Sequence, residues 1–263
     1  MLKFQNYVRA KSLEEAWELN QNRRNRILGG MMWLKMSNGT AGTVIDLCDL
    51  GLDKIEETEE EFSIGAMVTL RQIELHEGLN NYSNNAVKTA VKDIVGVQFR
   101  NTATVGGSIF GRYGFSDVLT VFSAMDCYVE LYKGGIVPLE QFAQSKKDND
   151  ILVRVIVKKS KGCFAYQSMR NTKTDFPVIA CAVSCIDGRY KASIGARPSR
   201  AITVYDDKNI IAEDVNEASV KAFAQYVADN APTQSNLRGS SEYRTHLIKV
   251  LVQRAIEDMK GAQ

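Results

Sequence analysis

The stretch Arg100–Ile109 constrains this chain more than any other part of its sequence. It reads Arg-Asn-Thr-Ala-Thr-Val-Gly-Gly-Ser-Ile, so small hydroxyl residues stand beside a Gly-Gly pair. Glycine lets a backbone approach a ligand closely, and successive inward-facing N–H groups with hydroxyls beside them form a seat for an anion. A second Gly-Gly pair occurs at Gly29–Gly30. Two such loops suit a ligand with two phosphates; the alternative interpretation is two tight turns.

Composition leaves little room for catalysis by side chains. The 263 residues include five cysteines and two histidines, with no Cys-x-x-Cys. We expect the cysteines to be small buried hydrophobic residues rather than disulfides or cluster ligands. Two histidines, His76 and His246, are too few for a zinc site or a Ser-His-Asp triad. We therefore predict no metal site and no catalytic side chain, and expect any chemistry to belong to a bound cofactor.

Charge and hydropathy bear on partners and location. The net charge of +2 predicts neither a nucleic-acid surface nor a polybasic membrane face. No apolar run is long enough to span a bilayer, and Met1–Gln5 has no signal-peptide character. We expect a cytoplasmic protein with no nucleic-acid partner and no membrane partner.

Local patterns predict a first lobe over residues 1–54 in which strands and helices alternate. Ser12 is expected to cap a helix, with Glu15 completing a capping box. Arg26–Leu28 is predicted to be a strand. A helix is expected to begin within Met31–Lys35, with its free N–H groups facing a phosphate.

Two further parts are predicted after this lobe. Residues 55–159 read as strands and helices, with an acidic turn at Glu56–Glu61 and a helix cap at Ser116–Asp117. From residue 160 the pattern changes to an antiparallel meander with a hairpin turn at Asp187–Gly188, and two helices close the chain.

The ordered set of motifs resembles a known family. Arg100–Ile109, followed by Asp117, resembles the FAD-binding subunit of the xanthine dehydrogenase and carbon monoxide dehydrogenase family of molybdenum hydroxylases. Leu28-Gly29-Gly30 stands where that family has its first phosphate loop. Ile151-Leu152-Val153 is similar to the family's last flavin-domain strand. The similarity covers almost the whole chain in the right order.

The resemblance implies an α+β fold: a two-lobed FAD-binding domain of the vanillyl-alcohol-oxidase (PCMH) type over 1–159, with lobes of about 1–54 and 55–159. A small α+β C-terminal domain over 160–263 follows it. It also implies electron transfer from iron–sulfur clusters on a partner subunit, through FAD, to NAD or another acceptor. Substrate oxidation would take place at a molybdopterin cofactor on another subunit of a hetero-oligomer.

The resemblance also assigns site residues to FAD. Gly29, Gly30 and the residues beside them would line the first phosphate loop, Asp117 would stand near the ribose and pyrophosphate, and Val153 would lie against the flavin. The complete set implied for FAD is Leu28, Gly29, Gly30, Met31, Met32, Trp33, Leu34, Ala103, Thr104, Val105, Gly106, Gly107, Ser108, Asp117, Val153 and Gln167.

Departures from the family pattern keep alternatives open. Met31 stands where the family commonly has a phosphate-binding Thr, and Gln167 aligns where many members have Lys. Residues 111–116 also differ from the family's usual Ser-Pro segment. One alternative is a scaffold subunit of the same kind of complex that has lost its flavin. The other is a flavin oxidase acting alone, which would need a catalytic base and often a covalent His or Cys tether.

Overall fold

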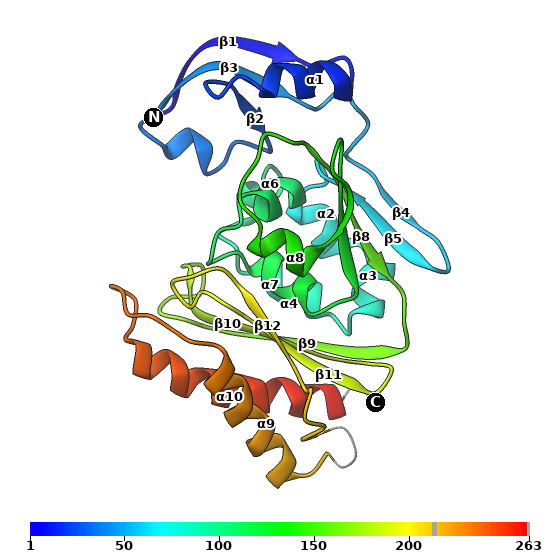
Figure 1. The fold of residues 1–263 in the computed structure, drawn as a ribbon, viewed down its shortest axis with the longest axis vertical. Coiled ribbons are helices and arrows are strands. Elements are labelled where there is room, and N and C mark those ends of the chain that lie inside the picture. The colour runs from blue at the N-terminus through cyan, green and yellow to red at the C-terminus, as the bar shows by residue number, and fades with distance from the viewer. Residues whose placement is uncertain (212–214, 262–263) are drawn as a thin grey trace.

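The computed structural model describes residues 1–211 and 215–261. Three sheets follow one another along the long axis of the molecule, from the N-terminal lobe to the C-terminal helices (Figure 1). Helices and strands are mixed throughout the described residues, as the α+β expectation requires.

The first lobe is built on a small parallel sheet. Its strands run in the order β1-β3-β2, and helix α1 packs against β3. The bounds are β1 Lys3–Arg9, α1 Leu13–Asn20, β2 Arg26–Leu28 and β3 Thr40–Asp46. The side chain of Ser12 accepts a hydrogen bond from the Glu15 N–H, which confirms the predicted helix cap.

The predicted helix at Met31–Lys35 is wrong. The chain forms only a short 3₁₀ turn, η1, over Leu34–Met36. Gly30 and Met31 have φ angles of 74° and 63°, in the left-handed region that a right-handed helix cannot use. Helical geometry therefore starts only after the loop has turned.

The middle of the molecule holds an antiparallel sheet in the order β4-β5-β8-β6-β7. Its strands are β4 Ile55–Glu57, β5 Glu61–Gly65, β6 Cys127–Leu131, β7 Gly135–Pro138 and β8 Leu152–Lys158. The acidic run at Glu56–Glu61 is not only a solvated turn, because its ends belong to strands β4 and β5 and three of its residues connect them in a hairpin.

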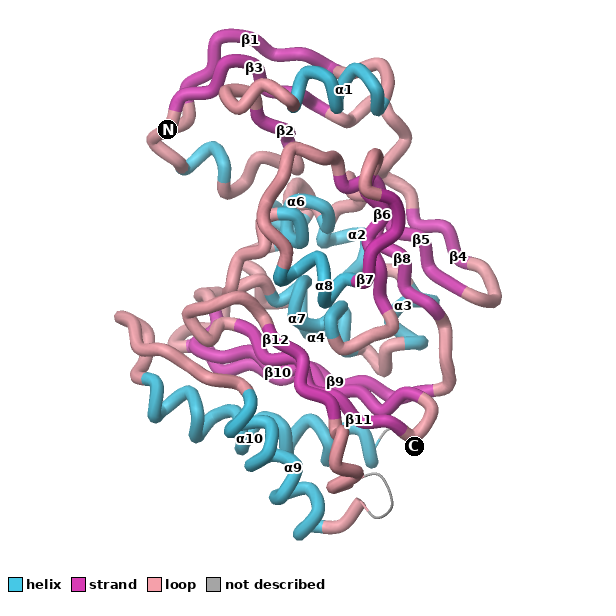
Figure 2. Tube along the Cα trace, in the orientation of Figure 1, coloured by secondary structure: helices cyan, strands magenta, loops and turns pink. Residues whose placement is uncertain are grey.

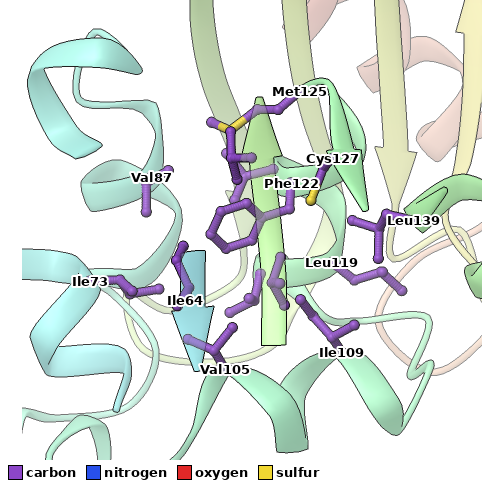
Figure 3. Close-up of a cluster of buried hydrophobic side chains, with 14 of the residues drawn as sticks. Ile64, Ile73, Val87, Val105, Ile109, Leu119, Phe122, Met125, Cys127 and Leu139 are labelled. Carbon is purple, nitrogen blue, oxygen red and sulfur yellow. The ribbon is translucent and has the colours of Figure 1, made fainter. Parts of the chain in front are cut away.

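Seven short helices lie beside this sheet: α2 Leu70–Leu75, α3 Glu77–Tyr82, α4 Ala86–Val91, α5 Val97–Arg100, α6 Val105–Phe110, α7 Asp117–Ser123 and α8 Leu139–Gln144. Their apolar side chains and those of the sheet form the largest hydrophobic core of the described chain. Figure 3 shows Val105 and Ile109 of α6 directed into this core beside Leu119 and Phe122 of α7. The glycine-rich stretch before α6 is therefore anchored by buried side chains.

The C-terminal part is an antiparallel meander in the order β12-β11-β10-β9, covered on one face by two helices (Figure 2). The bounds are β9 Gly162–Arg170, β10 Pro177–Ile186, β11 Arg189–Gly195, β12 Ile202–Tyr205, α9 Glu217–Asn230 and α10 Ser241–Gly261. Asp187 and Gly188 both have positive φ, which confirms the predicted hairpin turn. The opposite face of the sheet packs on α4 and α7, which joins this part to the middle of the molecule.

Candidate cofactor site between the two glycine loops

A cavity of about 450 Å³ lies where the two Gly-Gly loops meet. The first loop, residues 28–34, leaves β2, and the second loop, residues 103–108, leads into α6. A third wall comes from residues 147–152, just before β8. The cavity is therefore bordered by segments that are far apart in the sequence, and its size is typical of a site for an organic cofactor.

The glycines allow the two loops to touch backbone against backbone. A Cβ atom on Gly107 would lie 2.8 Å from the carbonyl oxygen of Gly29. A Cβ atom on Gly29 would lie 3.0 Å from the Thr104 hydroxyl and 3.1 Å from the Cα of Gly107. Any side chain at either position would separate the loops, so these glycines are needed for packing as well as for access by a ligand.

The other glycine of each pair is also closely packed, but against different partners. Gly30 has a left-handed φ of 74°, and a Cβ there would lie 1.9 Å from the carbonyl oxygen of Thr102. A Cβ on Gly106 would lie 2.6 Å from the carbonyl oxygen of Ala66 and 2.7 Å from its Cβ. Gly30 thus contacts the opposite loop, whereas Gly106 contacts the end of β5.

The amides of the second loop are used inside the protein. The N–H of Val105 donates to Val68 O at 2.8 Å, and that of Gly106 to Ala66 O at 2.9 Å. The N–H of Gly107 donates to the Thr104 hydroxyl at 3.2 Å, which caps α6. The N–H of Ser108 donates to Thr104 O at 3.1 Å. The expectation that successive amides of this loop face a ligand is therefore wrong for these four residues.

The amides of the first loop are free. Within the described chain, the N–H groups of Gly30, Met31, Met32 and Trp33 donate no hydrogen bond, and neither does the N–H of Thr104 in the facing loop. Met31, Met32, Trp33 and Thr104 line the cavity. Uncommitted backbone donors at a cavity wall are the groups that bind a phosphate without a basic side chain. The residues present therefore fit an anionic cofactor.

Comparison with known proteins identifies the family. Residues 2–159 match the family model described as the FAD binding domain in molybdopterin dehydrogenase. This chain belongs to that family. Residues 164–259 match the model of the CO dehydrogenase flavoprotein C-terminal domain. The expected family, its FAD cofactor and the PCMH-type fold are thereby confirmed.

Individual relatives resemble the chain along its whole length. The glyceraldehyde dehydrogenase medium chain of Sulfolobus acidocaldarius is 26% identical, with 96% of this chain and 97% of the relative covered. The xanthine dehydrogenase FAD-binding subunit of Escherichia coli O157:H7 is 24% identical, with 100% and 98% covered.

Solved structures share the fold. A carbon monoxide dehydrogenase chain from Oligotropha carboxidovorans superposes with a TM-score of 0.89 at 20% identity, with 99% of each chain covered. A carbon monoxide dehydrogenase chain from Hydrogenophaga pseudoflava gives 0.87 at 21% identity, with 99% and 98% covered. Among the described residues, no helix of this FAD-binding protein is long and apolar enough to cross a membrane.

Most of the residues expected to contact FAD do line the large cavity. They are Leu28, Gly29, Met31, Met32, Trp33, Leu34, Ala103, Thr104, Gly106, Gly107 and Ser108. Gly30 and Val105 lie in the loops without lining it, and Val105 is directed into the core instead (Figure 3).

Asp117 lies in a smaller neighbouring cavity of about 90 Å³. Ser116, not Asp117, caps α7, because the Ser116 hydroxyl accepts the hydrogen bond from Leu119 N–H. The Asp117 carboxylate accepts hydrogen bonds from Tyr166 and, at 2.7 Å, from Arg170. Burial raises the pKa of Asp117, while Arg170 and Tyr166 act in the opposite direction. Asp117 is thus committed to joining α7 to the C-terminal sheet.

Val153 and Gln167 lie outside the large cavity. Val153 is buried in β8, and its carbonyl accepts a hydrogen bond from Ala66 N–H, whereas its neighbour Leu152 lines the cavity. Successive residues of a strand face opposite sides, which accounts for the difference. Gln167 lies in β9 and donates to Asp258 of α10 at 2.5 Å. The structure therefore does not bring Gln167 together with the glycine loops.

Aromatic rings separate the two cavities. Trp33 of the first lobe lies with its ring centre 5.8 Å from Phe115 and 5.1 Å from Phe176 of the C-terminal part. Phe115 and Phe176 are 4.3 Å apart. Trp33 and Tyr113 border both cavities. The rings form an apolar wall, contributed by all three parts of the chain, that can exclude water from a bound cofactor.

Sequence reasoning missed the third wall of the cavity. Residues 147–150 read Lys-Asp-Asn-Asp and line it, as do Ile151 and Leu152. Asn149 O accepts a hydrogen bond from Asn20 at 2.8 Å, and Asp150 accepts from Gly134 N–H at 2.7 Å. The only signal in the sequence was a polar run directly before a strand rich in β-branched residues. Such a run does not by itself indicate which loops it will contact. Burial is the largest cause that lowers the pKa of Lys147, and the positive charges of Arg112 and Arg200 lower it further.

Proposed function

We propose that this chain is the FAD-binding electron-transfer subunit of a molybdenum hydroxylase. Electrons would arrive from iron–sulfur clusters on a partner subunit and leave for NAD or another acceptor. Substrate would be oxidised at a molybdopterin cofactor on a further subunit. Family membership and the names of the xanthine dehydrogenase and carbon monoxide dehydrogenase relatives support this role.

We assign the phosphate seat to the free amides. The N–H groups of Gly30–Trp33 and of Thr104 would hold the pyrophosphate, with Gly29 and Gly107 keeping the loops in contact. When bound, FAD supplies the two-electron redox chemistry. The protein's own residues bind it, orient it and exclude water, and Trp33 and Tyr113 contribute the apolar wall.

One observation carries the proposal. Two Gly-Gly loops from different parts of the chain meet backbone against backbone, and the first leaves four successive amides without a partner in the described chain. A turn that serves only the fold has no need to leave so many donors unsatisfied beside a cavity.

We further propose that residues 1–159 form the FAD-binding domain, with lobes of about 1–54 and 55–159, and that residues 160–263 form the C-terminal domain. We also propose a cytoplasmic location. The NAD linkage is the part of the proposal that depends on an acceptor outside this chain.

Visible absorbance of the purified full chain, with and without added FAD, tests the proposal. We expect oxidised-flavin bands that persist after free FAD is removed. Loss of the bands on adding NADH would support NAD as acceptor, and bands that ignore NADH would assign another acceptor. No uptake of FAD, even with the iron–sulfur partner present, would contradict the proposal and favour the scaffold alternative.

Gly107→Ala tests whether contact between the two loops is needed for FAD binding. Its Cβ would lie 2.8 Å from Gly29 O, so we expect FAD to bind at least tenfold more weakly, about 1.4 kcal/mol. Gly39→Ala is the control, because the atom nearest to its Cβ, the Ser37 hydroxyl oxygen, would be 3.8 Å away, in ordinary contact. Equal FAD affinity in both variants would show that contact between the loops does not form the site.

A further inference from the structure

Two cysteines face each other across the C-terminal sheet. Cys163 of β9 is paired with Cys185 of β10 in the antiparallel register. Cys163 is 9% exposed and Cys185 is half-buried. Both lie on the sheet face that packs against α9 and α10, away from the FAD-binding cavity. The pair has no part in the function proposed above.

The backbone places the two thiols within bonding reach. Phe164 N–H donates to Asn84 at 3.1 Å, out of the sheet, so the backbone groups of its neighbour Cys163 face β10. Directly opposed residues whose backbones bond to each other have Cα atoms about 5.5 Å apart. Disulfides span Cα separations of about 4.4–6.8 Å. The Cα separation of such a pair therefore fits a disulfide. The Cβ atoms of a hydrogen-bonded facing pair lie about 5.5 Å apart and a disulfide needs about 3.5–4.5 Å, so the two strands draw together locally when the S–S bond forms.

The two thiols already interact. A hydrogen bond from Cys163 is the largest influence on Cys185; it outweighs burial and, with smaller help from Tyr190 and the Gly188 backbone, lowers the pKa of Cys185 to about 6. Asp187 acts in the opposite direction. A thiolate is the nucleophilic form of cysteine, so Cys185 would react first.

We propose that Cys163 and Cys185 form a redox-active pair that a hydroperoxide converts reversibly into a disulfide. The Cys185 thiolate attacks the peroxide; the O–O bond breaks, an S–O bond forms, and a proton completes the departing water or alcohol. The Cys163 sulfur then attacks the Cys185 sulfenic acid, and water leaves as the S–S bond forms. Two thiols are oxidised by two electrons and one peroxide is reduced.

The remaining cysteines provide a contrast. Burial raises the pKa of Cys127 and of Cys181. Cys48 is exposed, yet burial of the sulfur and then the neighbouring Asp46 raise the pKa of its thiol. Cys181 lies on the same pair of strands but opposite Gln167, so no thiol faces it across the strands.

The experiment exposes the full chain to hydrogen peroxide at pH 7, blocks remaining thiols with N-ethylmaleimide and maps peptides by mass spectrometry. We expect a Cys163–Cys185 crosslink, two hydrogen masses lighter, that dithiothreitol removes. Cys181→Ser should crosslink at the wild-type rate. Cys163→Ser should give no crosslink and accumulate a Cys185 sulfenic acid that dimedone traps.

The pH dependence of Cys185 alkylation distinguishes a reactive thiolate from two cysteines that are only close together. Alkylation of Cys185 by iodoacetamide in the wild-type chain should rise with a midpoint near pH 6 and outpace that of Cys48 at pH 7, although Cys48 is exposed. If Cys163→Ser does not fold, Cys163→Ala should also give no crosslink, and Cys185, without the hydrogen bond from Cys163, should then react with the peroxide more slowly. No crosslink in the wild-type chain, or equal peroxide consumption after Cys185→Ser, would overturn the proposal.

Discussion

The two glycine loops share a dipeptide and differ in what their backbones do. In the first loop, four successive amides from Gly30 to Trp33 have no acceptor in the described chain. In the second loop, the amides from Val105 to Ser108 all donate to other protein atoms. The same sequence signal therefore serves two purposes: the first loop supplies hydrogen-bond donors to a ligand, and the second loop packs against the first and holds it in place.

The difference follows from what each loop is attached to. The second loop begins a helix whose Val105 is fully buried in the main core (Figure 3). The amides of this loop donate to residues 66–68 and to Thr104. The first loop connects a three-residue strand to a single 3₁₀ turn, and its left-handed residues prevent a helix from taking up its amides. The second loop, whose amides are bonded, thus faces the first loop, whose amides are free.

Gly30→Ala should have the largest effect and would test the first loop. Its Cβ would lie 1.9 Å from Thr102 O at a φ of 74°, so the free amides must move. We expect FAD affinity to fall by about a hundredfold, about 3 kcal/mol, measured by flavin absorbance titration.

Gly51→Ala is its control, since Gly51 has a φ of 67° but no atom within 4 Å of the added Cβ. That variant carries the conformational cost alone and should bind FAD normally. If Gly30→Ala also binds FAD like the wild type, the first loop is not the donor loop.

Gly106→Ala should act mainly on stability and would test the second loop. The added Cβ would lie 2.7 Å from the Cβ of Ala66 at the edge of the main core. We expect the free energy of unfolding to fall by about 1–3 kcal/mol, measured by denaturant titration. FAD affinity of the folded fraction should change less than in Gly30→Ala.

The matched variant is Gly96→Ala, whose Cβ would have its nearest neighbour, the Gln98 side chain, at 3.5 Å. It should leave stability nearly unchanged. A larger loss of FAD affinity in Gly106→Ala than in Gly30→Ala would reverse the assignment of the two loops.

Met31→Gly should have the smallest effect. Met31 has a φ of 63°, which glycine adopts without strain, but the Met31 side chain packs against the small core of Leu28, Ala41 and Val44. We expect the relief of strain and the lost packing to offset each other, so the free energy of unfolding should change by less than about 1 kcal/mol in thermal unfolding. FAD affinity should be unchanged because the N–H of residue 31 is kept. A drop in FAD affinity would mean that the Met31 side chain, not its amide, contributes to the site.

Elements with a local chemical signal were predictable. The side chain of Ser12 accepts the predicted hydrogen bond from Glu15 N–H, and Asp187–Gly188 form the predicted hairpin turn. Strand β1 escaped notice because all but one of its residues are exposed, so it has no apolar alternation. Strand β12 was missed as well: it is a four-residue strand at the edge of its sheet.

The candidate site was predictable only in part. Both Gly-Gly loops line one cavity, as their shared motif suggested, but only the first leaves its amides free. The part of the wall at residues 147–150 is polar and has no motif, so nothing local indicates that it closes the cavity. Gln167 was assigned to FAD through resemblance, yet its strand carries it to Asp258.

The sequence by itself determined where the backbone can come close: Gly29–Gly30 and Gly106–Gly107 lack the Cβ atoms that would keep the loops apart. Only the tertiary structure decided which of these loops keeps its amides free. A hydrogen bond depends on what lies opposite, and residues 66–68 lie opposite the second loop while the cavity lies beside the first. Spacing along the chain carries no information about that partner.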